Sequence, residues 1–474
     1  MEDQSQGQDR RSFLRNAGMG GSVLAMGPLL ASIQADAASA APMAGGKFDF
    51  DTPYNRIGTN SVHWDMAIRD EHMTKIIAGM GVADMDFKCA PAIMAGLRKR
   101  MEHENWGYNL MEIDLAFNTG RTNPFIDGII EWNRKRYGIT NVTPKNLGVN
   151  TGVHSGIIAA MQAYAPPGSG VLMATPIYGG FYGDVARTKT VAVESPMKMV
   201  NGRFEIDWED FERRMTPNVK VSILCNPQNP VGRAWTKEEL TKYVSLCLKH
   251  NIVVLSDEIH CDFVSKGHKY VPVATLDDKK LVDNTITFKS VSKSFSLAGM
   301  KCAWYFSTNP EIFARTQANV HADLNTLGVV AAQSAYAGGA EWMDACVDYI
   351  DGNHDFANQY IKANIPLIKT GAKPEGTYLT WLDISGVADK MGAQKMTDQI
   401  NKNPPANPMT GKPQKQQNED IVSHYLAKNA FVYLQPGTGF GLGGHNHLRM
   451  NIATSRRTLK AALDSVAGAL KNLA

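Results

Sequence analysis

The sequence has few cysteines, and their spacing gives them neither a disulfide framework nor a metal site. It contains 474 residues and six cysteines, and no two of these form a C-x-x-C pair. His260-Cys261-Asp262 and His445-Asn446-His447 also lack zinc-site spacing, so we expect no metal. Where a cysteine falls in or beside an apolar run, we expect it to pack as a small hydrophobic residue. The six are Cys89, Cys225, Cys247, Cys261, Cys302 and Cys346.

Signals for several other classes of protein are also missing. The formal net charge is only +3 and no basic run carries interleaved aromatics, so we expect no nucleic-acid partner. No internal repeat is evident, and beyond the N-terminal leader no stretch is apolar for long enough to span a membrane. With 43% hydrophobic and 20% charged residues, the chain can form a large core. Its length leaves room for two or three domains of about 100–200 residues each.

The N-terminus has the pattern of an export signal. Arg10 and Arg11 precede Ser-Phe-Leu, a twin-arginine motif, and a weakly apolar, glycine-rich stretch follows. Ala35-Asp36-Ala37 or Ala38-Ser39-Ala40 offers a cleavage site. We therefore predict a signal peptide over residues 1–40, the twin-arginine translocase as partner during export, and a folded protein in the periplasm. The alternative is a disordered basic tail.

The remaining chain predicts an α/β fold. Between residues 91 and 330, apolar runs alternate with helical patterns such as the amphipathic run from Trp235 to His250. The runs are apolar on both faces, as buried parallel strands are. We predict a large domain with a mostly parallel sheet covered by helices. Its expected strands are Val171–Ala174, Val219–Leu224, Ile252–Ser256, Thr285–Phe288 and Cys302–Phe306.

A smaller α/β domain is expected from residues 41–90 and 331–474. Its predicted elements are strands over Thr377–Ile384 and Leu448–Ala453, a bridging helix over Glu341–Ala363 and a closing helix over Arg457–Leu473. Residues 390–420 are rich in Pro, Asn, Gln and Lys, which predicts a solvated surface insertion.

Lys293 is the most informative residue. It follows an apolar strand and lies among small hydroxyl residues, in Ser290-Val291-Ser292-Lys293-Ser294. A lysine amine forms a Schiff base with an aldehyde, and pyridoxal 5′-phosphate (PLP) is the aldehyde cofactor that needs one. The alternative for this motif alone is an ordinary buried lysine.

Three further segments supply groups that PLP requires. Asp257 ends an apolar strand, where it could keep the pyridine nitrogen of PLP protonated, although it could also cap a turn. Asn229 lies in a rigid turn with two Asn-Pro steps, and its amide could reach the ring oxygen. Gly152, Val153 and His154 open an apolar helix, whose N-terminal amides could bind a phosphate.

Together these four segments resemble the fold-type I PLP enzymes of the aspartate aminotransferase superfamily, in the family's order along the chain. The resemblance extends from about Phe48 to the C-terminus. Asp84-Met85-Asp86, Trp106-Gly107-Tyr108 and Asp257-Glu258-Ile259-His260 look like the MalY/PatB subgroup of carbon–sulfur lyases, with His260 as the sharpest marker. His260 could also be a packed turn residue.

The resemblance implies a role for each matched residue. Lys293 would bind PLP and move the Cα proton, and Asp257 would pair with the pyridine nitrogen. Tyr178 would stack on the ring, and Arg449 would bind the substrate carboxylate. Asp84, in the subgroup's Asp84-Met85-Asp86 loop, would also bind the substrate, and Tyr108 would reach the phosphate of a neighbouring subunit in a homodimer. Asn229 and His260 would flank the ring oxygen, and the phosphate would be held by Gly152, Val153, His154, Ser290 and Ser292.

One position departs from the pattern. Many relatives carry an arginine eight residues after the lysine, where this chain has Lys301. A lysine keeps the positive charge but loses the two-pronged hydrogen bonding of arginine. Either the phosphate is held more loosely or Lys301 points elsewhere.

Two reactions fit these residues. The first is a PLP-dependent β-elimination from an L-cysteine S-conjugate such as cystathionine, giving thiol, pyruvate and ammonia. The second is transamination, which uses the same lysine, aspartate and arginine. A non-catalytic binding or regulatory protein of the same fold is a third class. The subgroup pattern and His260 favour the lyase.

Overall fold

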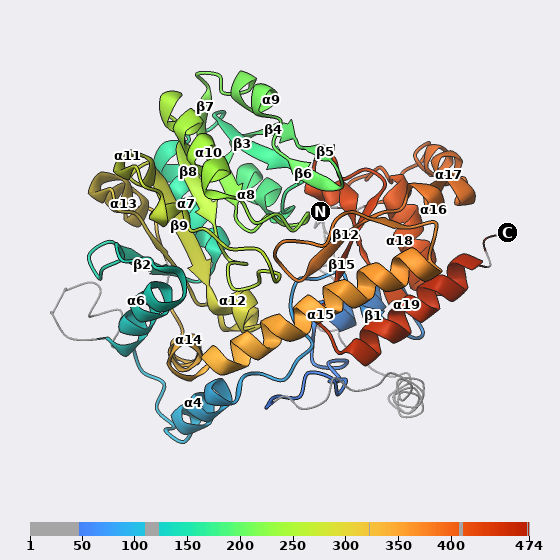
Figure 1. The fold of residues 1–474 in the computed structure, drawn as a ribbon, viewed down its shortest axis with the longest axis horizontal. Helices are drawn as coiled ribbons and strands as arrows, with labels where there is room; N and C mark the ends of the chain where they lie inside the picture. Colours follow the sequence, from blue (N-terminus) through green and yellow to red (C-terminus); the bar gives the residue numbers. More distant parts are fainter. Residues whose placement is uncertain (1–46, 110–122, 322, 407–410, 472, 474) are drawn as a thin grey trace, which may run out of the picture.

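The computed structural model describes residues 47–109, 123–321, 323–406, 411–471 and 473. The predicted signal peptide lies outside these residues. A seven-stranded sheet forms the centre of the larger part of the molecule (Figure 1). Its strands, in spatial order, are β2 (Leu147–Asn150), β10 (Ala303–Phe306), β9 (Thr285–Ser290), β8 (Val253–Asp257), β7 (Val219–Cys225), β3 (Gly170–Thr175) and β4 (Val191–Pro196).

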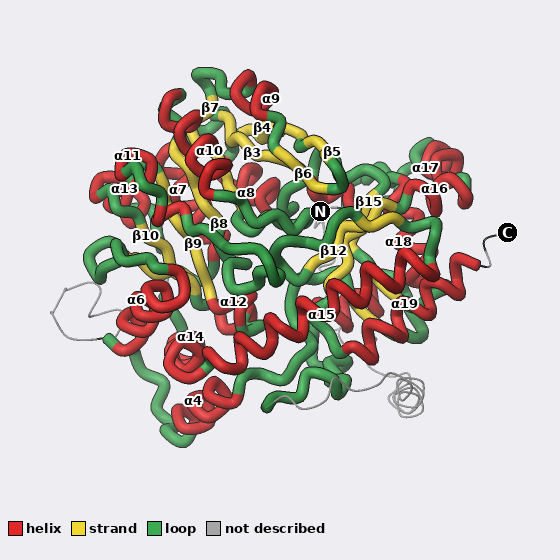
Figure 2. Tube along the Cα trace, viewed as in Figure 1, coloured by secondary structure: helices red, strands yellow, loops and turns green. Residues whose placement is uncertain are grey.

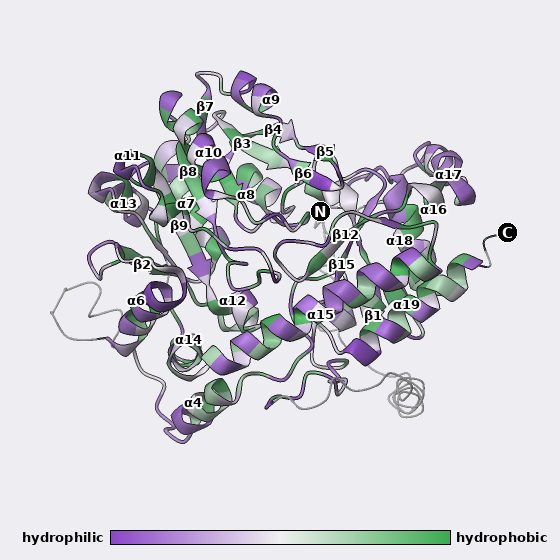
Figure 3. Ribbon diagram, in the orientation of Figure 1, coloured by the Kyte–Doolittle hydropathy of each residue, from purple (hydrophilic) through white to green (hydrophobic). Residues whose placement is uncertain are grey.

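Both faces of this sheet are buried, as the apolar runs predicted. Along β3, Val171 and Met173 pack with one hydrophobic cluster, whereas Leu172 and Ala174 pack with another. The first cluster includes residues of α7 (Val153–Tyr164), α8 (Gly180–Thr188) and α13 (Pro310–Gln317). The second includes residues of α9 (Trp208–Arg213), α10 (Lys237–Lys249) and α11 (Lys279–Val282). The strands are accordingly hydrophobic along most of their length (Figure 3).

One strand runs against the prediction. Cys302–Phe306 was expected to be parallel, but β10 pairs antiparallel with both β9 and β2. A parallel connection needs a crossover, usually a helix long enough to traverse a sheet face. Between β9 and β10 the chain forms only α12 (Val291–Ser294) and a turn of 3₁₀-helix, η4 (Ala298–Met300). The short connection therefore returns the chain in the opposite direction.

A four-stranded antiparallel sheet forms the core of the smaller part of the molecule. Its order is β11 (Lys369–Thr370), β12 (Leu379–Asp383), β15 (His447–Asn451) and β14 (Gln435–Pro436). Two further pairs complete the strands: β1 (Ala78–Gly79) with β13 (Val432–Tyr433), and β5 (Lys198–Val200) with β6 (Arg203–Glu205).

The long helix α15 (Ala340–Asn364) extends from the large sheet to the smaller part and lies beside α19 (Arg456–Lys471) (Figure 2). Both were predicted to within a few residues. Before α15 come η2 (Val62–Met66), α3 (Ala67–Asp70), α4 (Pro91–Met101), α6 (Pro124–Tyr137) and α14 (Thr326–Gly338). Within the described residues, no helix combines the length and apolar character needed to cross a membrane.

The segment 390–420 is more ordered than a solvated loop. Helix α16 (Ser385–Met391) ends at Gly392, which has a positive φ of 65°, and α17 (Ala393–Ile400) follows at once. Ala393 and Thr397 of α17 are buried. Helix α18 (Asn418–Asn429) then begins inside the predicted insertion. The prediction of a solvated loop relied on the overall polar composition of the segment. It did not take into account that Ala393 and Thr397, four residues apart, lie on one buried face of a helix.

Candidate active site

Several of the predicted site residues follow strands that end at one edge of the large sheet. Strands β2, β3, β7, β8 and β9 are mutually parallel, so their carboxyl ends meet at the same edge. Asp257 is the last residue of β8, and the Asn229 turn follows β7. Lys293 lies in α12 directly after β9, and Gly152 lies directly after β2.

Lys293 is held between the two parts of the molecule. Ser290 caps α12 by accepting a hydrogen bond from the Ser292 amide at 2.9 Å. The Lys293 ammonium donates to the carbonyl oxygen of Ala83 at 2.6 Å. Burial and the nearby Arg449 charge lower the pKa of Lys293 to about 8, although the carboxylates of Asp84 and Asp257 act in the opposite direction. More of this amine is therefore neutral near pH 7 than of an ordinary lysine.

The pKa of Asp257 is raised, whereas that of Lys293 is lowered. Its side chain is 5% exposed and accepts one hydrogen bond, from the Ile259 amide at 3.1 Å. Burial raises the pKa of Asp257 to about 6, and the positive charges of His154 and Lys293 only partly offset this. A buried carboxylate with one hydrogen bond favours a cationic partner, as the pyridinium nitrogen of PLP would be.

Arg449 is a buried cation without an acidic partner. Its side chain is 4% exposed, and its guanidinium donates to Asn229 Oδ1 at 3.1 Å and to the Gly81 carbonyl at 2.6 Å. No carboxylate of the described residues pairs with it, and its Nε atom is buried without a hydrogen-bond partner. Burial lowers the pKa of Arg449 to about 10. An unpaired buried guanidinium is costly, so the site fits an incoming carboxylate.

His260 and Tyr178 complete the centre of the site. His260 is buried, and its Nδ1 atom has no hydrogen-bond partner among the described residues. Burial and then the charges of Lys293 and Arg449 lower the pKa of His260 well below its usual value, so the ring is neutral. The ring of Tyr178 packs edge-on against Phe181 at 5.5 Å. The orphaned His260 nitrogen is a polar atom that a ligand could satisfy.

The predicted phosphate site is formed by two helix starts. Gly152 precedes α7, and a β-carbon added there would meet no atom within 4 Å, so the space beside it is open. The amides of Val153 and His154 begin the helix, where N–H groups lack intrahelical acceptors. Ser290 and Ser292 hydrogen bond to each other through their hydroxyls at 2.7 Å. The small residues and the N-terminal amides of α7 here fit a phosphate.

Three predicted residues are placed differently from the rest. Lys301 is exposed at the end of η4, and its ammonium makes no hydrogen bond or ion pair with the described residues. Tyr108 is 98% exposed and is not enclosed in its own chain. Asp84, predicted to contact substrate, already uses both carboxylate oxygens. Arg56 donates to them at 2.8 and 3.0 Å, and His63 contacts Oδ1.

Several side chains of the site were missed from the sequence. Asn451 and Tyr378 hydrogen bond to backbone carbonyls beside Lys293. The imidazole of His154 contacts the buried Asp184 at 2.5 Å, whereas only its amide was expected to act. Arg56 and His63 were also not predicted, because nothing in their spacing indicates that they contact Asp84.

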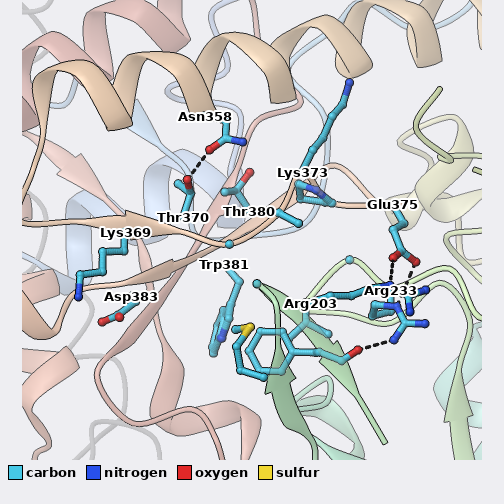
Figure 4. A pocket seen from close by; sticks show the side chains of 18 of the residues that line it. Arg203, Arg233, Asn358, Lys369, Thr370, Lys373, Glu375, Thr380, Trp381 and Asp383 are labelled. Atoms are coloured by element: carbon cyan, nitrogen blue, oxygen red, sulfur yellow. Dashed lines mark hydrogen bonds and ion pairs between the residues drawn. The ribbon is translucent and has the colours of Figure 1, made fainter. Parts of the chain in front are cut away.

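A separate cavity of about 250 Å³ lies between the β5–β6 hairpin and β12 (Figure 4). Arg203 and Arg233 both bind Glu375 on one wall, and Trp381 and Lys369 belong to the opposite side. None of the predicted PLP residues lines this cavity. We therefore place the chemistry at the Lys293 edge of the sheet and not in this cavity.

Comparison with known proteins identifies the family of the chain. Residues 122–466 match the family described as aminotransferase class I and II. The chain belongs to this family. Within it, the chain is 32% identical to cystathionine beta-lyase PatB of Bacillus subtilis (strain 168), over 89% of this chain and all of that protein. It is 26% identical to the protein MalY of Escherichia coli (strain K12), over 90% and 99% of the two chains.

A solved structure of a PLP-bound C–S lyase from Staphylococcus hominis superposes with a TM-score of 0.75. Its sequence is 27% identical, and the match covers 90% of this chain and 99% of that one. The resemblance to the aspartate aminotransferase superfamily and the α/β fold predicted from the sequence are thereby confirmed. The roles of the individual site residues remain predictions from the sequence and from the geometry of the site.

The lowered pKa of Lys293 predicts how the unloaded enzyme reacts with PLP. Only the neutral amine attacks an aldehyde. The rate of PLP attachment should therefore rise with pH and level off above about pH 8. Stopped-flow absorbance would measure this rate, and borohydride reduction followed by peptide mapping should place the cofactor on Lys293. Attachment at another lysine would refute the assignment.

The raised pKa of Asp257 predicts opposite effects of Asp257→Asn on stability and turnover. Because the folded pKa, about 6, exceeds the usual 3.8, the unloaded protein should lose stability as pH rises from about 4 to 6. The variant removes this cost, roughly 2–3 kcal/mol. Chemical denaturation of unloaded protein at pH 7 should show the gain, while turnover of loaded protein falls steeply. Wild-type turnover in the folded variant would contradict the role.

Proposed function

We propose that this protein is a PLP-dependent C–S lyase that acts on L-cysteine S-conjugates such as cystathionine. The observation that carries the proposal is one buried edge with a lysine of lowered pKa, a buried carboxylate and an unpaired guanidinium. The names of the relatives support the reaction class: cystathionine beta-lyase and C–S lyase.

Each residue has a task in such an elimination. Bound PLP supplies an electron sink for the pair of electrons left when the Cα proton is removed. Arg449 binds the substrate carboxylate and fixes the orientation of the Cα–H bond. The Lys293 amine, with a pKa of about 8, takes the Cα proton at that position. Asp257 holds the positive charge of the pyridine nitrogen in place.

The overall reaction balances without an oxidant. The Cα–H and Cβ–S bonds break, the sulfur leaves as a thiol with one proton, and water releases the remaining fragment as pyruvate and ammonia. Lys293 regains its free amine at the end of each cycle. Cystathionine and one water thus give homocysteine, pyruvate and ammonia.

Transamination is the second candidate, because the family itself includes aminotransferases. The same lysine, aspartate and arginine serve both reactions, and only the fate of the amino group differs. His260 beside the site, with the C–S lyase names of the relatives, favours elimination.

A test of amino-acceptor dependence separates the two reactions. Cystathionine and enzyme without keto acid should give pyruvate, ammonia and free thiol in equal amounts. Arg449→Lys should keep the fold but raise KM and lower kcat, because the lost charged hydrogen bonds, about 1.5–3 kcal/mol, orient as well as bind. If product forms only when a keto acid is added and then aminated, the aminotransferase assignment replaces the lyase.

We also propose a homodimer in which Tyr108 serves the partner's site. Tyr108 is 98% and Trp106 is 52% exposed, and both lie on one loop after α4. Two large aromatic side chains in solvent indicate a contact surface. Two-fold dimers are the commonest assembly of identical chains.

Mixing two inactive variants tests this arrangement. Lys293→Ala and Tyr108→Ala subunits, unfolded and refolded together, should regain about a quarter of wild-type activity, since half of the dimers carry one intact site. Each variant refolded alone is the control. Sedimentation would show whether dimers formed, and dimers without recovered activity would exclude a shared site.

Export as a folded protein is a further proposal, supported by Arg10 and Arg11 in the twin-arginine pattern. Replacing both with lysine should leave active enzyme in the cytoplasm. Unchanged delivery of that variant to the periplasm, measured by fractionation, would refute it.

A further inference from the structure

Residues Gly81–Met85, here called the strap, hold both functional cations of the site. All five of their carbonyl oxygens accept hydrogen bonds from side chains. The donors are Arg449 to Gly81 (2.6 Å), Asn451 to Val82 and Asp84 (2.7 and 2.6 Å), Lys293 and Tyr378 to Ala83 (2.6 and 2.9 Å), and Arg56 and Ser296 to Met85 (3.2 and 3.4 Å). The position of the strap therefore sets where Lys293 and Arg449 rest.

Asp84 anchors the strap to the N-terminal segment. Arg56 donates to both of its carboxylate oxygens, and the buried His63 contacts one of them. Although burial alone would raise the pKa of Asp84, the bonds from His63 and Arg56 outweigh it and hold that pKa well below its usual value. Asp84 is thus charged throughout the working pH range.

The Asp84 charge also acts on Lys293. It raises the pKa of Lys293 more than Asp257 does, against burial and the Arg449 charge. The other titratable groups that interact with Lys293 are His154 of α7, whose own pKa it lowers, and His260 after β8. Among these groups, Asp84 is the one joined to the N-terminal segment.

We propose that Asp84 is a positioning residue that acts on Lys293 in two ways: it anchors the strap that accepts from Lys293, and its negative charge favours the protonated form of that amine. The proposal rests on the proposed function, since Lys293 is the group it serves. Asp84 touches neither substrate nor cofactor in this role. Its carboxylate stays bound to Arg56 and His63, and its effect reaches Lys293 through the Ala83 carbonyl and through charge.

The first test removes the charge. In the PLP-loaded enzyme, the visible absorption of the lysine-bound cofactor changes with pH at a midpoint set by the charges around Lys293. Asp84→Asn should lower this midpoint by about one pH unit, because the lost carboxylate no longer favours the protonated nitrogen. Asp86→Asn is the matched control. Asp86 accepts from the same Arg56 at 3.1 Å and from Trp64 at 2.9 Å, and it is not among the charges that shift Lys293.

The second test should shift the pH midpoint in the opposite direction. Arg56→Gln leaves Asp84 charged but without its guanidinium partner, so the midpoint should move upward, by about half a unit. Asp84→Glu keeps the charge and displaces the anchor, so it should keep the wild-type midpoint while kcat falls more than KM changes. Opposite shifts for Asp84→Asn and Arg56→Gln separate charge from general loosening of the fold.

A readout without cofactor keeps this inference distinct from the proposed function. In unloaded protein, the pH profile of Lys293 acetylation, followed by mass spectrometry, should have its midpoint near 8 and shift in the same order among the variants. If PLP binds elsewhere, this profile still tests Asp84. An unchanged midpoint in folded Asp84→Asn, or an equal shift in Asp86→Asn, would overturn the proposal. If Asp84→Asn does not fold, Arg56→Gln decides: a midpoint that falls or stays fixed overturns it.

Discussion

The site depends on burying two positive charges, Lys293 and Arg449, within electrostatic reach of each other and without a carboxylate bonded to either. Burial lowers the pKa of Lys293 and of His260, and the charge of Arg449 lowers both values further. Backbone carbonyls of the strap take the place of acidic partners: Gly81 accepts from Arg449 and Ala83 from Lys293. A carbonyl dipole stabilises a cation less than a carboxylate does. Arg449 therefore remains available to an anionic group of a ligand, and Lys293 can lose its proton and react with an electrophilic one.

The need to bring Lys293 and Arg449 close together explains why the site lies between two sheets. The large sheet delivers Asp257 and Lys293 at its carboxyl edge, and β15 of the small sheet delivers Arg449. The cross-strand partner of Arg449 on β12 is Trp381, and Phe440 packs on both of their side chains. Neither sheet alone supplies an acid, an amine and a carboxylate-binding group.

Much of this arrangement could be predicted from the sequence, because strand ends are local signals. Asp257, Asn229 and Lys293 each follow an apolar run, and parallel strands end at one edge. The direction of β10 was predicted wrongly because it depends on the short connection between β9 and β10. The pattern of apolar residues in a strand does not indicate the direction of that strand. The strap contacts were missed for a different reason. Asn451 is 367 residues from Asp84 along the chain, and Arg56 and Asp84 lie outside helices and strands. Backbone carbonyls leave no residue-type signature.

Opposite shifts of two pKa values set the chemistry that the site can perform. Burial raises the pKa of Asp257 to about 6 and lowers that of Lys293 to about 8. The two pKa values are therefore much closer to each other than those of an ordinary aspartate and lysine. A carboxylate that accepts a pyridinium and an amine that can lose its proton therefore coexist near neutral pH. Arg449 lowers the pKa of Lys293, whereas Asp84 raises it. A carboxylate arriving at Arg449 would remove that lowering effect and raise the proton affinity of Lys293 at the moment when the amine must take a proton from Cα.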